Sequence, residues 1–107
     1  ARLHSPVRGV FAVLVEGLEQ HPTGGVANVG NRPTLQGDDR FVLEVHLFDF
    51  EREVYGQQVS VMFLQRIRDE QKFESFDALR QQILLDAEQA RQVCLTYMNN
   101  PTDQAIK

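Results

Sequence analysis

A run of apolar residues at positions 10–15 limits the possible fold more than any other feature of the sequence. Valine, phenylalanine, alanine and leucine fill all six positions, so a strand formed there has no polar face. Most of these residues are β-branched or aromatic, which favours a strand over a helix. Such a strand is typical of one covered on both faces or lying in a closed barrel. The rest of the chain must therefore cover both sides of it.

Three further strands are predicted at residues 26–29, 41–50 and 57–66, joined by short segments rich in glycine and polar residues. Between the second and third of these, residues 30–35 contain Pro33, which has no N–H and restricts the residue before it. We expect these residues to stop pairing and form a loop that presents polar groups. The order of strands and turns predicts an antiparallel meander or a small barrel.

A helix is predicted over residues 75–99. Ser75 is a good N-cap, and Asp77 in the first turn suits the positive end of the helix dipole. One apolar stripe, spaced by three and four residues, would pack on the sheet; it comprises Leu79, Ile83, Ala87, Ala90, Cys94 and Tyr97. The charged segment 67–74 precedes this helix, and residues 100–107 are expected to form a loose tail.

The composition is that of one soluble globular domain spanning residues 1–107. Apolar residues make up 42% and charged residues 24%, and the net charge of -4 argues against a nucleic-acid or membrane partner. No apolar run is long enough to cross a bilayer, so we expect a cytoplasmic protein. The single cysteine, Cys94, is expected to be a small buried hydrophobe of the helix.

Glu44 and His46 form the best-placed ionisable pair. They lie two residues apart on the strand at 41–50, so they share one face at roughly 6.6 Å between their Cα atoms. They are either two polar residues on a solvated face or groups that act on one ligand. No phosphate-binding glycine loop, zinc motif or nucleophilic-serine turn is present in the sequence. Glu44 is therefore the candidate general base.

Several blocks of sequence together resemble the riboflavin kinase domain, as found in the C-terminal half of bacterial bifunctional riboflavin kinase/FMN adenylyltransferases. The first is Gly-Val-Ala-Asn-Val-Gly-Asn-Arg-Pro-Thr at residues 25–34, and the second is Leu-Glu-Val-His-Leu-Phe-Asp-Phe at residues 43–50. Tyr-Gly at 55–56, Phe-Leu at 63–64 and Ile-Arg-Asp-Glu-Gln-Lys-Phe-Glu-Ser at 67–75 follow in the same order.

This resemblance implies a mainly β fold, an antiparallel Greek-key barrel with one C-terminal α-helix. The barrel strands would fall at about 8–66, a flap over the flavin at 67–74 and the helix at 75–99. It implies phosphorylation of riboflavin to FMN with ATP and Mg²⁺, as a step of FAD biosynthesis, with Glu44 taking the hydroxyl proton. It also assigns flavin contacts to Arg68, Phe73, Asn31 and Arg32, and nucleotide contacts to His46 and Tyr55.

One motif of the family is missing. The segment Pro-Thr-Ala-Asn, which holds Mg²⁺ and the ATP phosphates, does not occur, because Pro33 and Thr34 are followed by Leu35. We therefore expect a barrel without its first strand, no metal ligands, an edge strand open to dimerisation and no kinase activity in these 107 residues alone. A non-catalytic flavin- or nucleotide-binding barrel and a structural interaction module are the alternatives.

Overall fold

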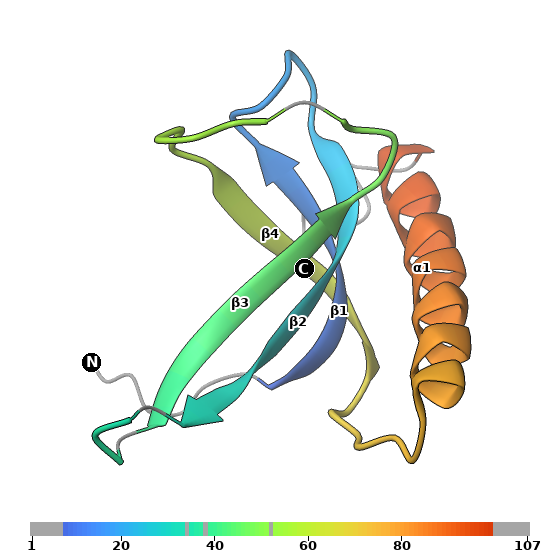
Figure 1. Cartoon of the computed structure of the whole chain (residues 1–107). Helices are drawn as coiled ribbons and strands as arrows, with labels where there is room; N and C mark the ends of the chain where they lie inside the picture. The colour runs from blue at the N-terminus through green and yellow to red at the C-terminus, as the bar shows by residue number, and fades with distance from the viewer. Residues whose placement is uncertain (1–7, 34, 38, 52, 100–107) are drawn as a thin grey trace.

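The described residues form four antiparallel strands and one long helix (Figure 1). The computed structural model describes residues 8–33, 35–37, 39–51 and 53–99. The elements are β1 (Gly9–Glu16), β2 (Thr23–Pro33), β3 (Asp39–Leu47), β4 (Ser60–Arg68) and α1 (Phe76–Asn99). The strand order is β3-β2-β1-β4, so the described strands form an open sheet with β3 and β4 as its edges. A mainly β fold with a C-terminal helix is confirmed, while the expected tail at 100–107 lies outside the described residues.

Strand β1 is the centre of the fold, as its apolar run predicts. All of its residues except the last are buried, and it pairs with β2 on one side and β4 on the other. On one face, Ala12 and Leu14 pack in a cluster with Ala90 and Cys94 of α1. The opposite face packs a second cluster that includes Phe11, Val13, Val15, Leu18 and Ala27. Burial of both faces explains why no polar residue interrupts the run.

The prediction that residues 30–35 stop pairing is wrong for residues 30–33. Strand β2 continues to Pro33, and its last residues pair with β3 from Gly30 opposite Val42 to Pro33 opposite Asp39. A proline at the end of a strand removes only the last ladder donor, so pairing up to that point is possible. Residue 34 lies outside the described residues.

Strand β3 ends earlier than predicted, at Leu47 instead of residue 50. The chain turns at Asp49, whose φ is +56°, and the Phe48 N–H donates to the Gly24 carbonyl oxygen at 2.9 Å. Because of this turn, Phe48 packs in the helix-side cluster while Phe50 packs against the cluster on the other face of the sheet.

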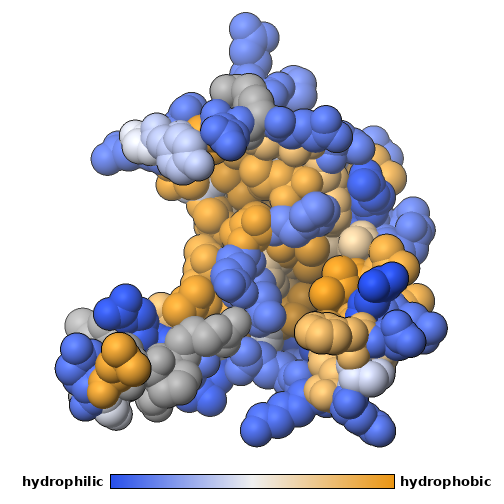
Figure 2. Space-filling model, in the orientation of Figure 1, coloured by the Kyte–Doolittle hydropathy of each residue, from blue (hydrophilic) through white to orange (hydrophobic). Residues whose placement is uncertain are grey.

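Helix α1 begins at the predicted N-cap. The Ser75 hydroxyl accepts a hydrogen bond from the Ala78 N–H at 3.1 Å, which satisfies one of the free donors of the first turn. The helix packs against β1, β2 and β4 through the predicted stripe, although Ile83 keeps 49% of its surface exposed. Figure 2 shows apolar residues gathered across the middle of the molecule, between more polar ends.

Candidate functional site

A cleft of about 320 Å³ separates the sheet from the N-terminal half of α1. The register of β2 and β3 places Asn28 opposite Glu44 and Val26 opposite His46. Glu44 and His46 share the face that is turned to the helix, as the strand alternation predicts, and both line the cleft. The other polar groups of the lining are Asn28 of β2, Arg68 of β4 and Asp86 of α1.

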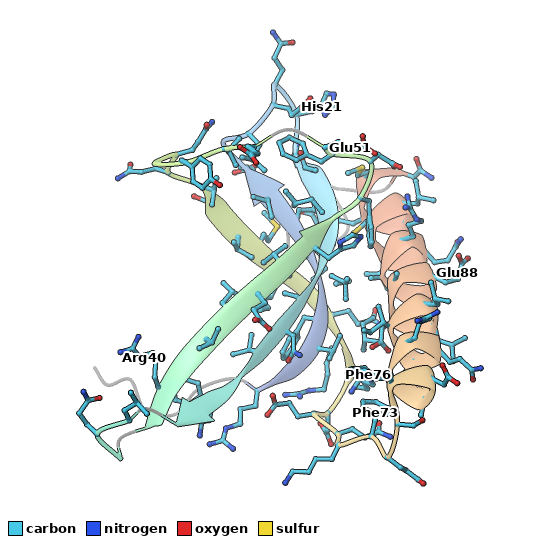
Figure 3. The ribbon with its side chains drawn as sticks, viewed as in Figure 1. His21, Arg40, Glu51, Phe73, Phe76 and Glu88 are labelled. Carbon is cyan, nitrogen blue, oxygen red and sulfur yellow. The ribbon has the colours of Figure 1, made fainter. Side chains whose placement is uncertain are left out.

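A second hollow, of about 520 Å³, continues the cleft toward the start of the helix. Asn28, Arg68 and Leu79 line both spaces, so the two lie next to each other. Phe73 and Phe76 also line the second hollow, and Figure 3 shows both beside the N-terminal end of α1. The combined cleft thus runs from the Glu44 carboxylate to a pair of aromatic rings.

Arg68 is fixed in the cleft by a buried ion pair with the helix. Its Nε donates to both carboxylate oxygens of Asp86, at 3.0 and 2.9 Å, and its Nη2 lies 2.8 Å from Oδ2. Gln82 donates to the same carboxylate from one turn earlier, at 2.9 Å. Asp86 is only 4% exposed and the Arg68 side chain 18%, so this pair is largely shielded from water.

The guanidinium of Arg68 also orders the segment that follows β4. Its Nη1 donates to the Asp69 carbonyl oxygen at 3.0 Å, and its Cζ lies 5.5 Å from the centre of the Phe73 ring. A cation near an aromatic face at this distance is attracted by the ring quadrupole. Arg68 and Phe73, both predicted at the flavin side of the site, are therefore in contact with each other.

Asn28 contributes a buried oxygen beside Glu44. Its Oδ1 is inaccessible to solvent and, among the described residues, has no hydrogen-bond partner. Because most buried polar atoms in proteins are hydrogen-bonded, an acceptor of this kind in a cleft lining suggests a ligand contact.

Two of the remaining predicted site residues, Asn31 and Tyr55, do not line the cleft. Asn31 lies three residues beyond Asn28 on a regularly paired strand and so belongs to the opposite face of the sheet. The side chain of Arg32 lies outside the described part of the structure. Tyr55, which is 86% exposed, lies in the connection between β3 and β4. Their assigned ligand contacts stay predictions.

The metal ion implied by the family resemblance finds no set of ligands in the described residues. No group of three Asp, Glu, His or Cys side chains lies close enough to hold a metal within residues 8–33, 35–37, 39–51 and 53–99. Of the two carboxylates that line the 320 Å³ part of the cleft, that of Asp86 is already bound to Arg68. The residues present do not fit the ion, and no catalytic step is assigned to it.

Another hollow, of about 300 Å³, lies near the C-terminal end of α1 and is lined in part by Asp49, Arg91 and Cys94. Arg91 pairs with Asp49 at 3.0 Å, and burial raises the pKa of the Cys94 thiol, whose Sγ donates to the Val13 carbonyl oxygen at 3.4 Å. A neutral, buried thiol is a packing group, as the sequence predicts for Cys94.

Sequence reasoning missed Asn28, Gln82 and Asp86. Asn28 was assigned to a short strand and to a block of the family resemblance but to no site, because its position opposite Glu44 depends on a register that links distant segments. Asp86 and Gln82 lie one helical turn apart, which places them on the same side of α1. A carboxylate so close to an apolar stripe is a signal that a buried cation is nearby, although the sequence does not identify Arg68 as that cation.

Comparisons with known proteins identify the family to which the chain belongs. The family model described as riboflavin kinase (flavokinase) matches residues 1–94, and the chain belongs to that family. It is 50% identical over 93 residues to the bifunctional riboflavin kinase/FMN adenylyltransferase of Haemophilus influenzae, covering 84% of the chain and 30% of that protein. With the protein of that name from Escherichia coli it is 49% identical over 88 residues, covering 82% and 28% respectively. The chain thus spans less than a third of the length of these relatives.

A solved structure shows a similar fold. It is a crystal structure described as a macrolide-efflux protein from Streptococcus pneumoniae, with a TM-score of 0.70 and 40% sequence identity. The match covers 80% of this chain and 28% of that one. In the part of the chain that the structure describes, no helix has the length and apolar character of a membrane span.

Proposed function

We propose that this chain supplies the riboflavin side of a kinase site that transfers the γ-phosphate of ATP to the 5′-hydroxyl of riboflavin. The observation that supports this most is the position of Glu44, on a paired strand and in the lining of a cleft, in a chain of the riboflavin kinase family. A carboxylate held by a rigid strand suits a general base, because its position relative to the substrate is fixed.

In the proposed reaction Glu44 accepts the proton of the 5′-hydroxyl. The hydroxyl oxygen then forms its bond to the γ-phosphorus, the bond from that phosphorus to the β,γ-bridging oxygen breaks, and ADP leaves. The base need only orient and deprotonate the alcohol, since most of the catalysis in phosphoryl transfer comes from positioning and charge stabilisation. The donors that stabilise the transferred phosphoryl group, and any Mg²⁺, lie outside the described residues of the cleft.

Arg68 and Phe73 are proposed to face the flavin ring. The charge of Arg68 is matched by Asp86 at 2.8 Å, so the guanidinium offers a flat surface more than an unpaired charge. A neutral, planar ring suits such a surface next to Phe73 better than a phosphate group does. His46, whose ring centre lies 6.1 Å from that of Phe48, lines the Glu44 end of the cleft and is proposed as a secondary contact.

The names of the longer relatives include a second activity, that of an FMN adenylyltransferase. If this chain forms part of such a protein, we propose that the adenylylation site lies in another segment. The expected lack of turnover by these 107 residues alone, a cytoplasmic location and pairing of two copies through an edge strand also stay predictions. Detection of FMN formed from riboflavin and MgATP by the isolated chain would contradict the first of them.

Glu44→Gln tests the role of the base. The change is made in a chimaera in which this chain replaces the matching segment of the Escherichia coli relative, with which it shares 49% identity over 88 residues. Loss of a general base is expected to lower kcat by about 10²- to 10⁴-fold, because the amide cannot accept the proton. Steady-state formation of FMN measures kcat, and quenching of riboflavin fluorescence measures binding, which is expected to change little.

His46→Gln is the matched control, because His46 lies on the same strand face and lines the same cleft. A much smaller loss of kcat is expected for it. If Glu44→Gln keeps full activity, the role of Glu44 as base is wrong, and binding without any turnover in the unchanged chimaera favours the non-catalytic flavin-binding barrel. Failure of the isolated chain and the chimaera to bind riboflavin favours the structural module.

A further inference from the structure

The cleft contains one polar atom that the protein itself leaves unsatisfied. Asn28 Oδ1 is buried and, within the described residues, accepts no hydrogen bond. An unpaired acceptor of this kind destabilises the fold, because its hydration is lost and nothing replaces it. A valine at this strand position would make the fold more stable than the asparagine does. The asparagine is therefore not explained by stability.

The position of Asn28 limits which part of a ligand it can contact. It stands directly opposite Glu44 in the β2–β3 register, where facing Cβ atoms lie roughly 4.5–5.5 Å apart. It also lines both hollows, so it lies where the Glu44 end of the cleft meets the end bounded by Phe73. A ligand that reaches from one end to the other must pass Asn28.

Oδ1 is an acceptor, so its ligand partner must be an O–H or N–H donor. In the proposed function Glu44 engages the terminal hydroxyl of a polyol chain and the aromatic end receives the ring. The donors between these two ends are the inner hydroxyls of that chain, whereas the ring N–H lies at the far end of the flavin.

We infer that Asn28 is a specificity-determining residue that accepts a hydrogen bond from an inner hydroxyl of the ribityl chain. This inference rests on the proposed function and extends it, because it makes the polyol, and not the ring alone, the part of the substrate that the sheet recognises. The hydrogen bond also holds the chain so that its terminal hydroxyl lies at the Glu44 carboxylate.

The test compares two ligands and two variants of the 107-residue chain. Riboflavin and lumiflavin share the same ring, but lumiflavin carries a methyl group in place of the ribityl chain. Asn28→Val and Asn28→Thr have nearly the same shape, and only the threonine keeps an oxygen that can accept a hydrogen bond. Dissociation constants come from fluorescence titration, and stability comes from urea unfolding.

For Asn28→Val the riboflavin dissociation constant is expected to rise about fivefold, the ratio for one hydrogen bond of about 1 kcal/mol, while that for lumiflavin stays within twofold. The riboflavin dissociation constant of Asn28→Thr should lie nearer that of the unchanged chain. The urea midpoint of Asn28→Val should equal or exceed that of the unchanged chain, since an unsatisfied acceptor is removed. If the asparagine had a purely structural role, Asn28→Val would instead have a lower urea midpoint than the unchanged chain.

Four other results are decisive in the opposite direction. An equal loss for both ligands would assign Asn28 to the ring and overturn the inference, and so would an unchanged riboflavin affinity in Asn28→Val. If the unchanged chain binds riboflavin no better than lumiflavin, the polyol is not recognised and the inference fails while flavin binding stands. If neither the unchanged chain nor the chimaera binds either ligand, the proposed flavin site itself is refuted.

Discussion

The buried ion pair between Arg68 and Asp86 should be the most sensitive polar contact of the fold. Asp86→Ala removes a carboxylate that is 4% exposed and that receives donors from both Arg68 and Gln82. The arginine is left behind with a side chain only 18% exposed. Breaking a buried pair in this way is costly mainly because the remaining charge has lost its partner.

The size of the stability loss depends on the contacts that Arg68 keeps in the Asp86→Ala variant. Removal of one partner of a buried pair costs about 3–5 kcal/mol of unfolding free energy. Arg68 retains its hydrogen bond to the Asp69 carbonyl oxygen and its contact with Phe73, and its partial exposure admits some water. We therefore expect the lower end of this range, about 3 kcal/mol, which corresponds to a fall in melting temperature of about 12–24 °C for a domain of this size.

Urea unfolding monitored by circular dichroism measures the change, with Asp69→Ala as the matched control. Asp69 also pairs with an arginine, Arg66 at 3.2 Å, but its side chain is 89% exposed. Exposed pairs contribute less than about 1 kcal/mol, so the control should unfold close to the unchanged chain. If the two variants lose the same small amount of stability, the burial argument for Asp86 is wrong.

A double change separates charge from packing. Arg68→Met with Asp86→Leu removes both charges and leaves apolar groups of similar size. Most of the lost stability should return, because no unpaired charge remains in the interior. A double variant as unstable as Asp86→Ala would show that the loss came from packing of the helix and not from the uncompensated arginine.

Two further predictions concern the helix. Ser75→Ala should lower the free energy of unfolding by about 1 kcal/mol, because the Ala78 N–H loses its 3.1 Å acceptor, and Ser75→Asp, which keeps an acceptor, should restore it in urea unfolding. Burial raises the pKa of Cys94, so the thiol of the unfolded chain ionises at a lower pH than that of the folded chain. The free energy of unfolding should therefore fall as the pH rises above the ordinary thiol pKa. Cys94→Ala should remove that part of the pH dependence, and an unchanged pH dependence in this variant would contradict the burial of the thiol as its cause.

Local signals predicted much of the fold because they are strong in this chain. The run at residues 10–15 requires cover on both faces, and β1 is the buried central strand. The end of β2 was misjudged because Pro33 suggests a break, yet at a strand terminus its missing N–H costs only one ladder bond. The turn after Leu47 was also missed, since it depends on the positive φ of Asp49, a residue that adopts this conformation only in some contexts.

Only the part of the candidate site that lies on a single strand could be predicted from the sequence. Glu44 and His46 share a face by alternation alone, so their common cleft follows from the sequence of β3. Asn28 belongs to the site because it pairs with Glu44, 16 residues further along the chain. Asp86 belongs to it because it pairs with Arg68, 18 residues earlier. Because such pairings depend on strand register and on how α1 sits against β4, no local pattern encodes them.

The same geometry explains why a charged residue lies in the buried side of α1. The apolar stripe alone would let the helix slide or rotate on the sheet, since Ala90 and Cys94 present small, similar surfaces. The contacts of Asp86 with Arg68 fix one rotation and one height of α1 relative to β4. Since Arg68 also lines the cleft that contains Glu44, the ion pair that positions the helix influences the width of the cleft as well. Stability of the helix–sheet contact and geometry of the candidate site therefore depend on the same two side chains.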